Sequence, residues 1–198
     1  PVARCGLRLR IGMAQKEFWP FEPVELEVCV GLKKGEHRAT SIPDMVDPGY
    51  ECFRIWVENP GGERRLYRSP LHYCGSSSVR RIAAGRPFER DITIFGQSGG
   101  YTFRLPGPHR VWATFALPGR GLLKSNILEV NVRPPAPDNP RYAVLREHLR
   151  RPPHASLLYY RSGNPDGRAV RRLTEFCDRF PDLPAAAATR YAIGRVLH

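Results

Sequence analysis

The feature that most restricts the fold of this sequence is a pair of alternating segments near residue 120. A Pro106-Gly107-Pro108 turn leads into residues 109–115, in which apolar and more polar side chains alternate, and a second alternating segment follows at 125–132. Successive side chains of a β-strand point to opposite faces, so this alternation predicts two half-buried strands. We therefore expect an antiparallel hairpin over residues 109–133.

The same period of two recurs upstream of this hairpin. Cys5, Leu7, Leu9 and Ile11 alternate with arginines, and comparable segments follow at 24–30, 52–58, 64–68, 79–82 and 88–94. Turn signals such as Asn59-Pro60-Gly61-Gly62 separate these segments. Roughly seven or eight short strands with intervening turns are typical of an antiparallel β-sandwich, and no strand–helix–strand alternation favours a nucleotide-binding α/β fold.

Three segments carry a resemblance to bacterial immunoglobulin-like domains: residues 21–28, 84–88 and 106–111. The likeness covers about residues 2–133 and implies an immunoglobulin-like sandwich. His109 stands where such domains commonly carry the tyrosine of a tyrosine corner. The histidine could form the same hydrogen bond to the backbone, or it could leave the corner looser.

The pattern changes at a proline-rich segment, residues 134–140, which predicts a stiff linker. Beyond it the apolar residues recur at helical spacing, so we divide the chain into a sandwich (1–133), a linker (134–140) and a helical extension (141–198). Residues 169–197 resemble a tetratricopeptide-type helix pair. Because one pair cannot form a solenoid, we expect it to pack on the sandwich or to continue in a partner.

The net charge of +12 comes mostly from arginine, which supplies 27 of the 31 basic residues. Arginine is well suited to phosphate recognition, so a nucleic-acid partner is one interpretation. The other is an arginine-biased composition with ordinary solvated faces. We favour the second because the charge is spread along the whole chain.

No motif of a common catalytic, metal or phosphate site is present in the context it requires. The sequence has no HExxH pair and no glycine-rich loop that links a strand to a helix. Residues 96–100 match GxSxG, but no helical pattern follows them, so they do not form a strand-to-helix elbow. His72, Cys74 and Cys52 are a weak alternative for three metal ligands. We interpret the five cysteines as thiols, with a Cys52–Cys74 disulfide as the alternative, and expect no catalytic residue, no metal and no cofactor.

Four aromatic residues are our candidate binding residues: Trp56, Trp112, Tyr101 and Phe103. The two tryptophans fall on the polar register of their strands, and the other two follow a glycine-rich loop. One interpretation is that the C-terminal helices cover the tryptophans, and the other is an exposed aromatic patch that binds a partner.

These patterns together predict a mainly β protein that acts as a non-catalytic protein-binding or scaffolding module. A nucleic-acid binder that uses arginine is one alternative, and an enzyme whose site forms only in three dimensions is another. We expect a protein partner and no membrane span, since no apolar run approaches the ~20 residues that a bilayer requires. Nothing in the sequence assigns a compartment.

Overall fold

The computed structural model describes residues 6–20, 22–69, 72–75, 78–97, 100–134 and 167–182, and the short pieces 186–187, 189–190 and 193–194. Within these residues the protein is mainly β, with a short helix near its C-terminus. The strands are β1 (Leu7–Gly12), β2 (Glu17–Phe18), β3 (Val24–Leu32), β4 (Thr40–Pro43), β5 (Phe53–Glu58), β6 (Arg64–Leu66), β7 (Val79–Ile82), β8 (Phe88–Ile94), β9 (Gly96–Gln97), β10 (Gly100–Tyr101), β11 (Gly107–Leu117), β12 (Gly121–Lys124) and β13 (Leu128–Val132). The helix is α3 (Gly167–Arg179).

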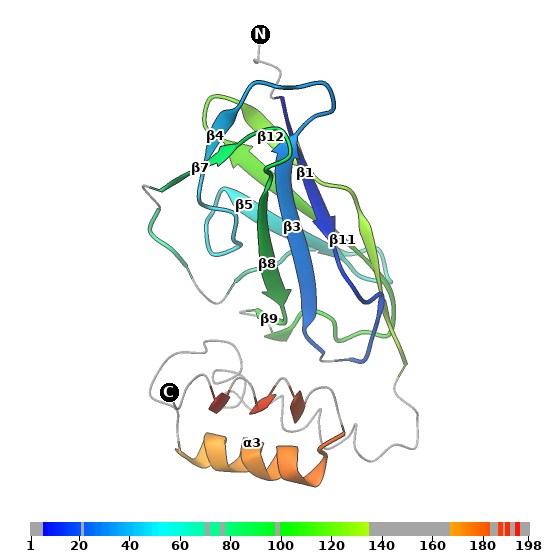
Figure 1. The fold of residues 1–198 in the computed structure, drawn as a ribbon. Coiled ribbons are helices and arrows are strands. Elements are labelled where there is room, and N and C mark those ends of the chain that lie inside the picture. The colour runs from blue at the N-terminus through cyan, green and yellow to red at the C-terminus, as the bar shows by residue number, and fades with distance from the viewer. Residues whose placement is uncertain are drawn as a thin grey trace.

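Two sheets face one another across a shared core (Figure 1). The smaller sheet has the order β1-β3-β8, and the larger has the order β2-β13-β11-β5-β6, with β12 also paired to β11. All these pairs are antiparallel except β13 with β2. Two small ribbons, β4-β7 and β9-β10, complete the β structure. The predicted mainly β, antiparallel class with a small C-terminal helix is therefore confirmed.

The core forms because the alternating side chains of both sheets turn inward. On β1 the predicted inner residues Leu7, Leu9 and Ile11 are all buried, and the arginines between them are exposed. The pattern repeats on β3, β5 and β11. Burial of apolar surface is the main favourable contribution to folding, and it explains why each strand adopts this register and not one shifted by one residue.

The predicted hairpin over 109–133 is in fact two pairings along one edge of β11. The second half of β11 pairs with β12, and its first half pairs with β13. Between them the Ser125 hydroxyl accepts a hydrogen bond from the Ala113 N–H at 2.8 Å, where a backbone carbonyl would normally stand. The next residue, Asn126, exchanges two hydrogen bonds with the backbone of Ile11 on the opposite sheet. This irregularity therefore ties the two sheets together.

Some short strands form outside the segments whose alternation predicts strands. β4 contains Pro43, yet it pairs with β7 over four residues. β2 begins one residue before the aromatic segment 18–23 and pairs in parallel with β13. Both are short strands that depend on a distant partner, and a local pattern does not reveal such partners.

The described helical residues form a second, smaller core. Leu173, Phe176 and Cys177 recur at helical spacing and are buried on one face of α3, which ends before Pro181. Arg190 donates to the carbonyl oxygen of Cys177 at 2.7 Å and so satisfies an acceptor in the last turn of α3. Among the described residues, no helix combines the length and the apolar composition needed to cross a lipid bilayer.

Part of the predicted C-terminal organisation belongs to residues that the structure does not describe. Residues 135–166 lie outside the described residues, and with them almost all of the predicted linker and the start of the helical extension. The spacing of Ala188, Tyr191 and Val196 predicts the inner face of a last helix, and these three residues also lie outside the described ones. In the described pieces, the buried residues are Ala186, Thr189 and Ile193.

Candidate functional site

Trp56 and Trp112 form one aromatic pair on the outer face of the larger sheet. They are direct cross-strand partners on β5 and β11. Their ring centroids lie 6.3 Å apart and their planes differ by 8°. The Trp56 Nε1–H donates to the hydroxyl oxygen of Thr114 at 3.3 Å, which holds the indole in place. The sheet therefore presents a preformed, half-buried aromatic surface.

Two cations flank this pair. The guanidinium carbon of Arg64 lies 5.9 Å from the Trp112 ring centroid, and the Lys124 ammonium nitrogen lies 6.0 Å from it. Both distances fall within the range of cation–π attraction. The β12 register places Lys124 opposite Thr114, so this lysine shares the outer face with Trp112.

Glu58 fixes the position of Arg64. Its carboxylate accepts hydrogen bonds from Arg64 Nε at 2.6 Å and from Arg110 Nη1 at 3.1 Å. The hydrogen bond from Arg64, and then that from Arg110, lowers the pKa of the Glu58 carboxyl. The carboxylate is therefore ionised at neutral pH and keeps Arg64 beside the aromatic pair.

An exposed leucine extends this surface. Leu122 lies on β12 opposite Ala116 and its side chain is 67% exposed. Leu122, Trp56, Trp112, Arg64 and Lys124 together are called the tryptophan face below.

The four predicted binding residues separate into two groups. Trp56 and Trp112 come together, as described. Phe103 is only 1% exposed and packs edge-to-face on His109, so its assignment as a binding residue is corrected: its ring belongs to the core. Tyr101 lies in β10, and its side chain is outside the described residues.

The interpretation in which the C-terminal helices cover the tryptophans stays a prediction, because most of the helical extension lies outside the described residues. Within the described residues, the contacts of the pair come from side chains of its own sheet. Sequence reasoning missed Arg64 and Lys124, because only the pairing of β5, β6, β11 and β12 brings them to the rings.

His109 adopts the first of its two predicted arrangements. Its side chain is 1% exposed, and Nδ1 lies 3.1 Å from the carbonyl oxygen of Gly107, to which an Nδ1–H donates. Burial lowers the pKa of His109, and the hydrogen bond to Gly107 partly opposes this effect. The adjacent cavity of about 60 Å³ has room for about two water molecules.

The buried His109 predicts a pH dependence of stability. Its pKa is lower in the folded protein than in the unfolded chain, where it is about 6.5. As the pH falls through 6.5, the unfolded chain therefore binds a proton that the folded protein does not, and stability decreases. Urea unfolding between pH 7 and 5 should show a smaller decrease for His109→Gln than for the wild type.

The control for this experiment is the exposed His37. We expect His37→Gln to follow the wild-type pH dependence. Parallel curves for the wild type and His109→Gln would show that His109 does not contribute.

The described cysteines are free thiols, including both Cys52 and Cys74, as we favoured. Burial raises the pKa of Cys52, and it raises that of Cys177 to about 11. Neither thiol is therefore primed as a nucleophile at neutral pH. No group of three or more histidine, cysteine or acidic side chains within the described ranges is arranged to hold a metal ion.

Comparisons with known proteins assign no family. No family model matches the chain, and no curated protein matches it. Among solved structures, the sporulation control protein Spo0M from Bacillus subtilis is similar with a TM-score of 0.42 and 12% identity, over 73% of this chain and 54% of that one. This chain therefore spans about half the length of that neighbour.

Two further neighbours are enzymes that are larger than the matched region. A β-glucosidase from Listeria innocua matches with a TM-score of 0.35 and 14% identity, over 65% of this chain and 16% of that one. The alkylpurine DNA glycosylase AlkC of Pseudomonas fluorescens matches with a TM-score of 0.35 and 10% identity, over 65% of this chain and 31% of that one. Likeness at this level carries no functional argument, so the function must be argued from the site.

Proposed function

We propose that this protein is a non-catalytic binding module that recognises a protein partner through the tryptophan face. The observation that supports the proposal is the parallel Trp56–Trp112 pair, held on a rigid sheet between two cations. Tryptophan and arginine are the residues most enriched at the energetic centres of protein interfaces. An immunoglobulin-like sandwich, which the sequence resembles, is compatible with this role.

The arrangement also limits the cost of binding. The Trp56 indole is fixed by Thr114, and Arg64 is fixed by Glu58, so little side-chain freedom remains to be lost when a partner docks. Leu122 is largely exposed in the free protein, so a partner that covers it would bury additional apolar area. A partner with an apolar surface and acidic residues at its edge would complement this face.

The first test compares two variants of the tryptophan face with one matched control. Trp112→Ala removes the aromatic pair, and Leu122→Asp places a charge on the face without disturbing the core. Val79→Asp is the control, because Val79 on β7 is 68% exposed, close to the 67% of Leu122. We expect affinity purification with quantitative mass spectrometry to show the same proteins lost from both face variants and kept by the control.

Thermal melts must accompany this comparison. Leu122→Asp should melt like the wild type, so its loss of partners would reflect the face and not the fold. If Leu122→Asp and a folded Trp112→Ala both retain every protein that the wild type captures, the proposal is wrong.

A nucleic-acid partner is the second candidate, and the cations beside the aromatic pair favour it. Bases stack on exposed aromatic rings, and Arg64 and Lys124 could neutralise phosphates. The discriminating measurement is retention on single-stranded DNA or RNA as salt increases, because phosphate contacts weaken steeply with salt. Retention that is insensitive both to salt and to Lys124→Ala would exclude this candidate.

A further inference from the structure

A large cavity lies at the end of the sandwich that carries β4, β7 and β12. Its volume is about 770 Å³, within the usual range of small-molecule sites. Its walls come from segments far apart in the sequence: the start of β1, the end of β3, the segment before β4, β7, and the turn between β11 and β12. Of the tryptophan face, no residue lines this cavity, so any ligand here is separate from the proposed function.

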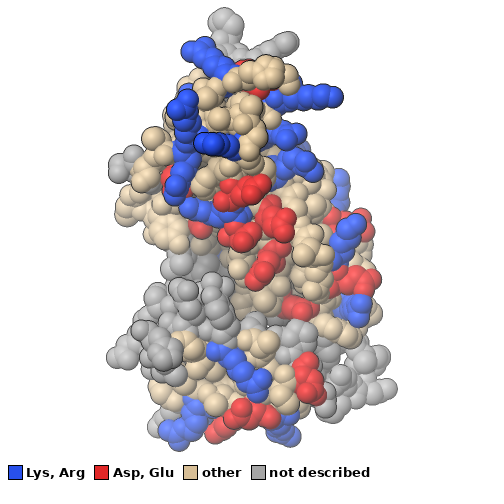
Figure 2. Space-filling model, viewed as in Figure 1, with Lys and Arg blue, Asp and Glu red and all other residues tan. Residues whose placement is uncertain are grey.

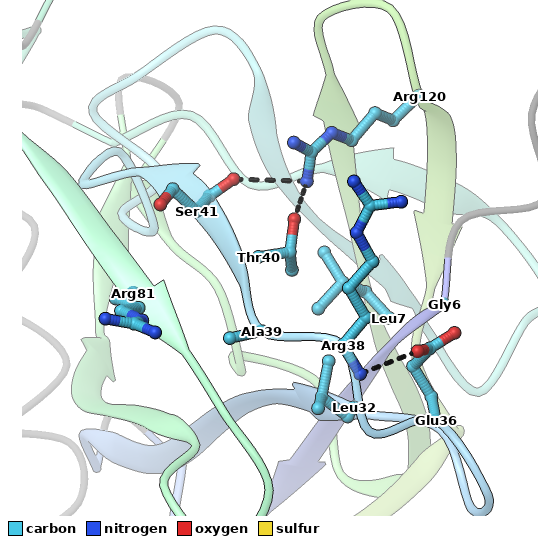
Figure 3. Close-up of a pocket in the computed structure, with 10 residues that line it drawn as sticks. All are labelled: Gly6, Leu7, Leu32, Glu36, Arg38, Ala39, Thr40, Ser41, Arg81 and Arg120. Carbon is cyan, nitrogen blue, oxygen red and sulfur yellow. Dashed lines mark hydrogen bonds between the residues drawn. The ribbon is translucent and has the colours of Figure 1, made fainter.

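Three arginines from three different segments line this cavity (Figure 3). Arg38 precedes β4, Arg81 lies on β7 and Arg120 lies in the turn after β11. Arg120 is held in place, since it donates to the hydroxyl of Thr40 and, at 3.2 Å, to the carbonyl oxygen of Ser41. One cation of the cavity is therefore fixed in position before any ligand arrives.

Arg38 and Arg81 differ from Arg120, because no described residue pairs with their guanidinium groups. Across the described ranges, neither guanidinium has an ion-pair partner or a side-chain hydrogen bond. Glu36 is the one carboxylate among the described lining residues, and it accepts a hydrogen bond from the Arg38 backbone N–H at 2.9 Å. Three guanidinium groups and one carboxylate leave the lining with a net of two positive charges.

The charge distribution of the whole surface points to the same end of the molecule. Figure 2 shows lysine and arginine side chains gathered there, whereas acidic side chains cover the middle of the β3-β8 surface. Exposed Glu25, Glu27, Glu89 and Asp91 on these two strands form that acidic area. An approaching anion is therefore drawn to the end of the sandwich and away from the middle of the smaller sheet.

We propose that this cavity binds a small molecule that carries a phosphate group. A phosphate monoester bears a charge close to −2 at neutral pH, which matches the net charge of the lining. The planar fork of arginine donates two parallel hydrogen bonds to phosphate oxygens. The partly exposed Leu32 and Ala39 also line the cavity, so the body of the ligand that carries the phosphate has an apolar part.

Phenyl phosphate is the probe that tests this proposal, because it combines a phosphate with an apolar ring. We expect saturable binding in isothermal titration calorimetry, and weaker binding of inorganic phosphate. Arg38→Ala and Arg81→Ala should each weaken phenyl phosphate binding about tenfold, as expected for the loss of one charged hydrogen-bond donor. Both side chains are exposed and pair with no described residue, so the two variants should melt like the wild type.

Arg171→Ala is the matched control, since it removes the same charge from the exposed surface of α3. It should change phenyl phosphate binding less than about twofold, because a distant surface charge is largely screened by salt. The absence of saturable binding to the wild type, or an equal loss in Arg171→Ala, would overturn the proposal. Displacement of phenyl phosphate by a short oligothymidine would instead assign the bound phosphate to a nucleic-acid backbone, and would overturn the small-molecule assignment.

Discussion

Replacing Phe115 by alanine should lower the free energy of unfolding of the β-sandwich by about 3–5 kcal/mol. Phe115 is fully buried on β11, between its cross-strand partners Phe53 on β5 and Leu123 on β12. Its ring meets that of Phe53 edge-to-face, with centroids 5.9 Å apart and planes at 65°. Alanine would remove this contact and leave a cavity where three strands of the larger sheet meet, and a close-packed core cannot fully collapse to fill it.

Urea unfolding followed by tryptophan fluorescence measures this effect. Trp19, Trp56 and Trp112 are the three tryptophans of the chain, and all lie in its β region, so the signal reports on the sandwich. Phe115→Leu is the matched control: it keeps most of the buried volume and should cost clearly less than Phe115→Ala. A loss below about 1 kcal/mol in Phe115→Ala, within the ordinary effect of a point mutation, would show that Phe115 is not central to the core.

The second large effect is expected for Ser125→Ala, at about 1–3 kcal/mol. The Ser125 hydroxyl accepts from the N–H of Ala113, a residue that is fully buried, and donates to the Asn126 carbonyl oxygen at 2.6 Å. Alanine would leave the Ala113 N–H without its acceptor inside the sandwich. It would also loosen Asn126, whose side chain joins the two sheets at Ile11.

Ser41→Ala is the control for this second experiment, because it makes the same chemical change at an exposed position of β4. It should alter the free energy of unfolding by no more than about 0.5 kcal/mol. Equal stability of Ser125→Ala and Ser41→Ala would mean that another acceptor replaces the Ser125 hydroxyl.

The sequence predicted the strands and their inner faces because side-chain direction along a strand is a local property. The alternation on β1 identified Leu7, Leu9 and Ile11 as inner residues, and all three are buried. The same reasoning placed Trp56 and Trp112 on the outer register, and the structure shows them there, half-buried. Because one face of each strand is buried and the other is solvated, apolar and polar residues alternate in the sequence.

Phe103 shows where local reasoning failed. It follows a glycine-rich loop, which suggested an exposed binding residue, yet its ring packs against His109 in the interior. The burial of a residue in a loop depends on what the rest of the chain places over it. No local period encodes that information.

Both candidate sites depend on pairings between distant parts of the chain. The alternating pattern by itself determined a two-sheet β protein with two tryptophans on an outer face. Only the tertiary structure stacked these rings, brought Arg64 and Lys124 to them, and gathered Arg38, Arg81 and Arg120 around one cavity. The physical reason is that strand alternation is set by neighbours two residues apart, whereas strand order and loop convergence are set by the packing of the whole core.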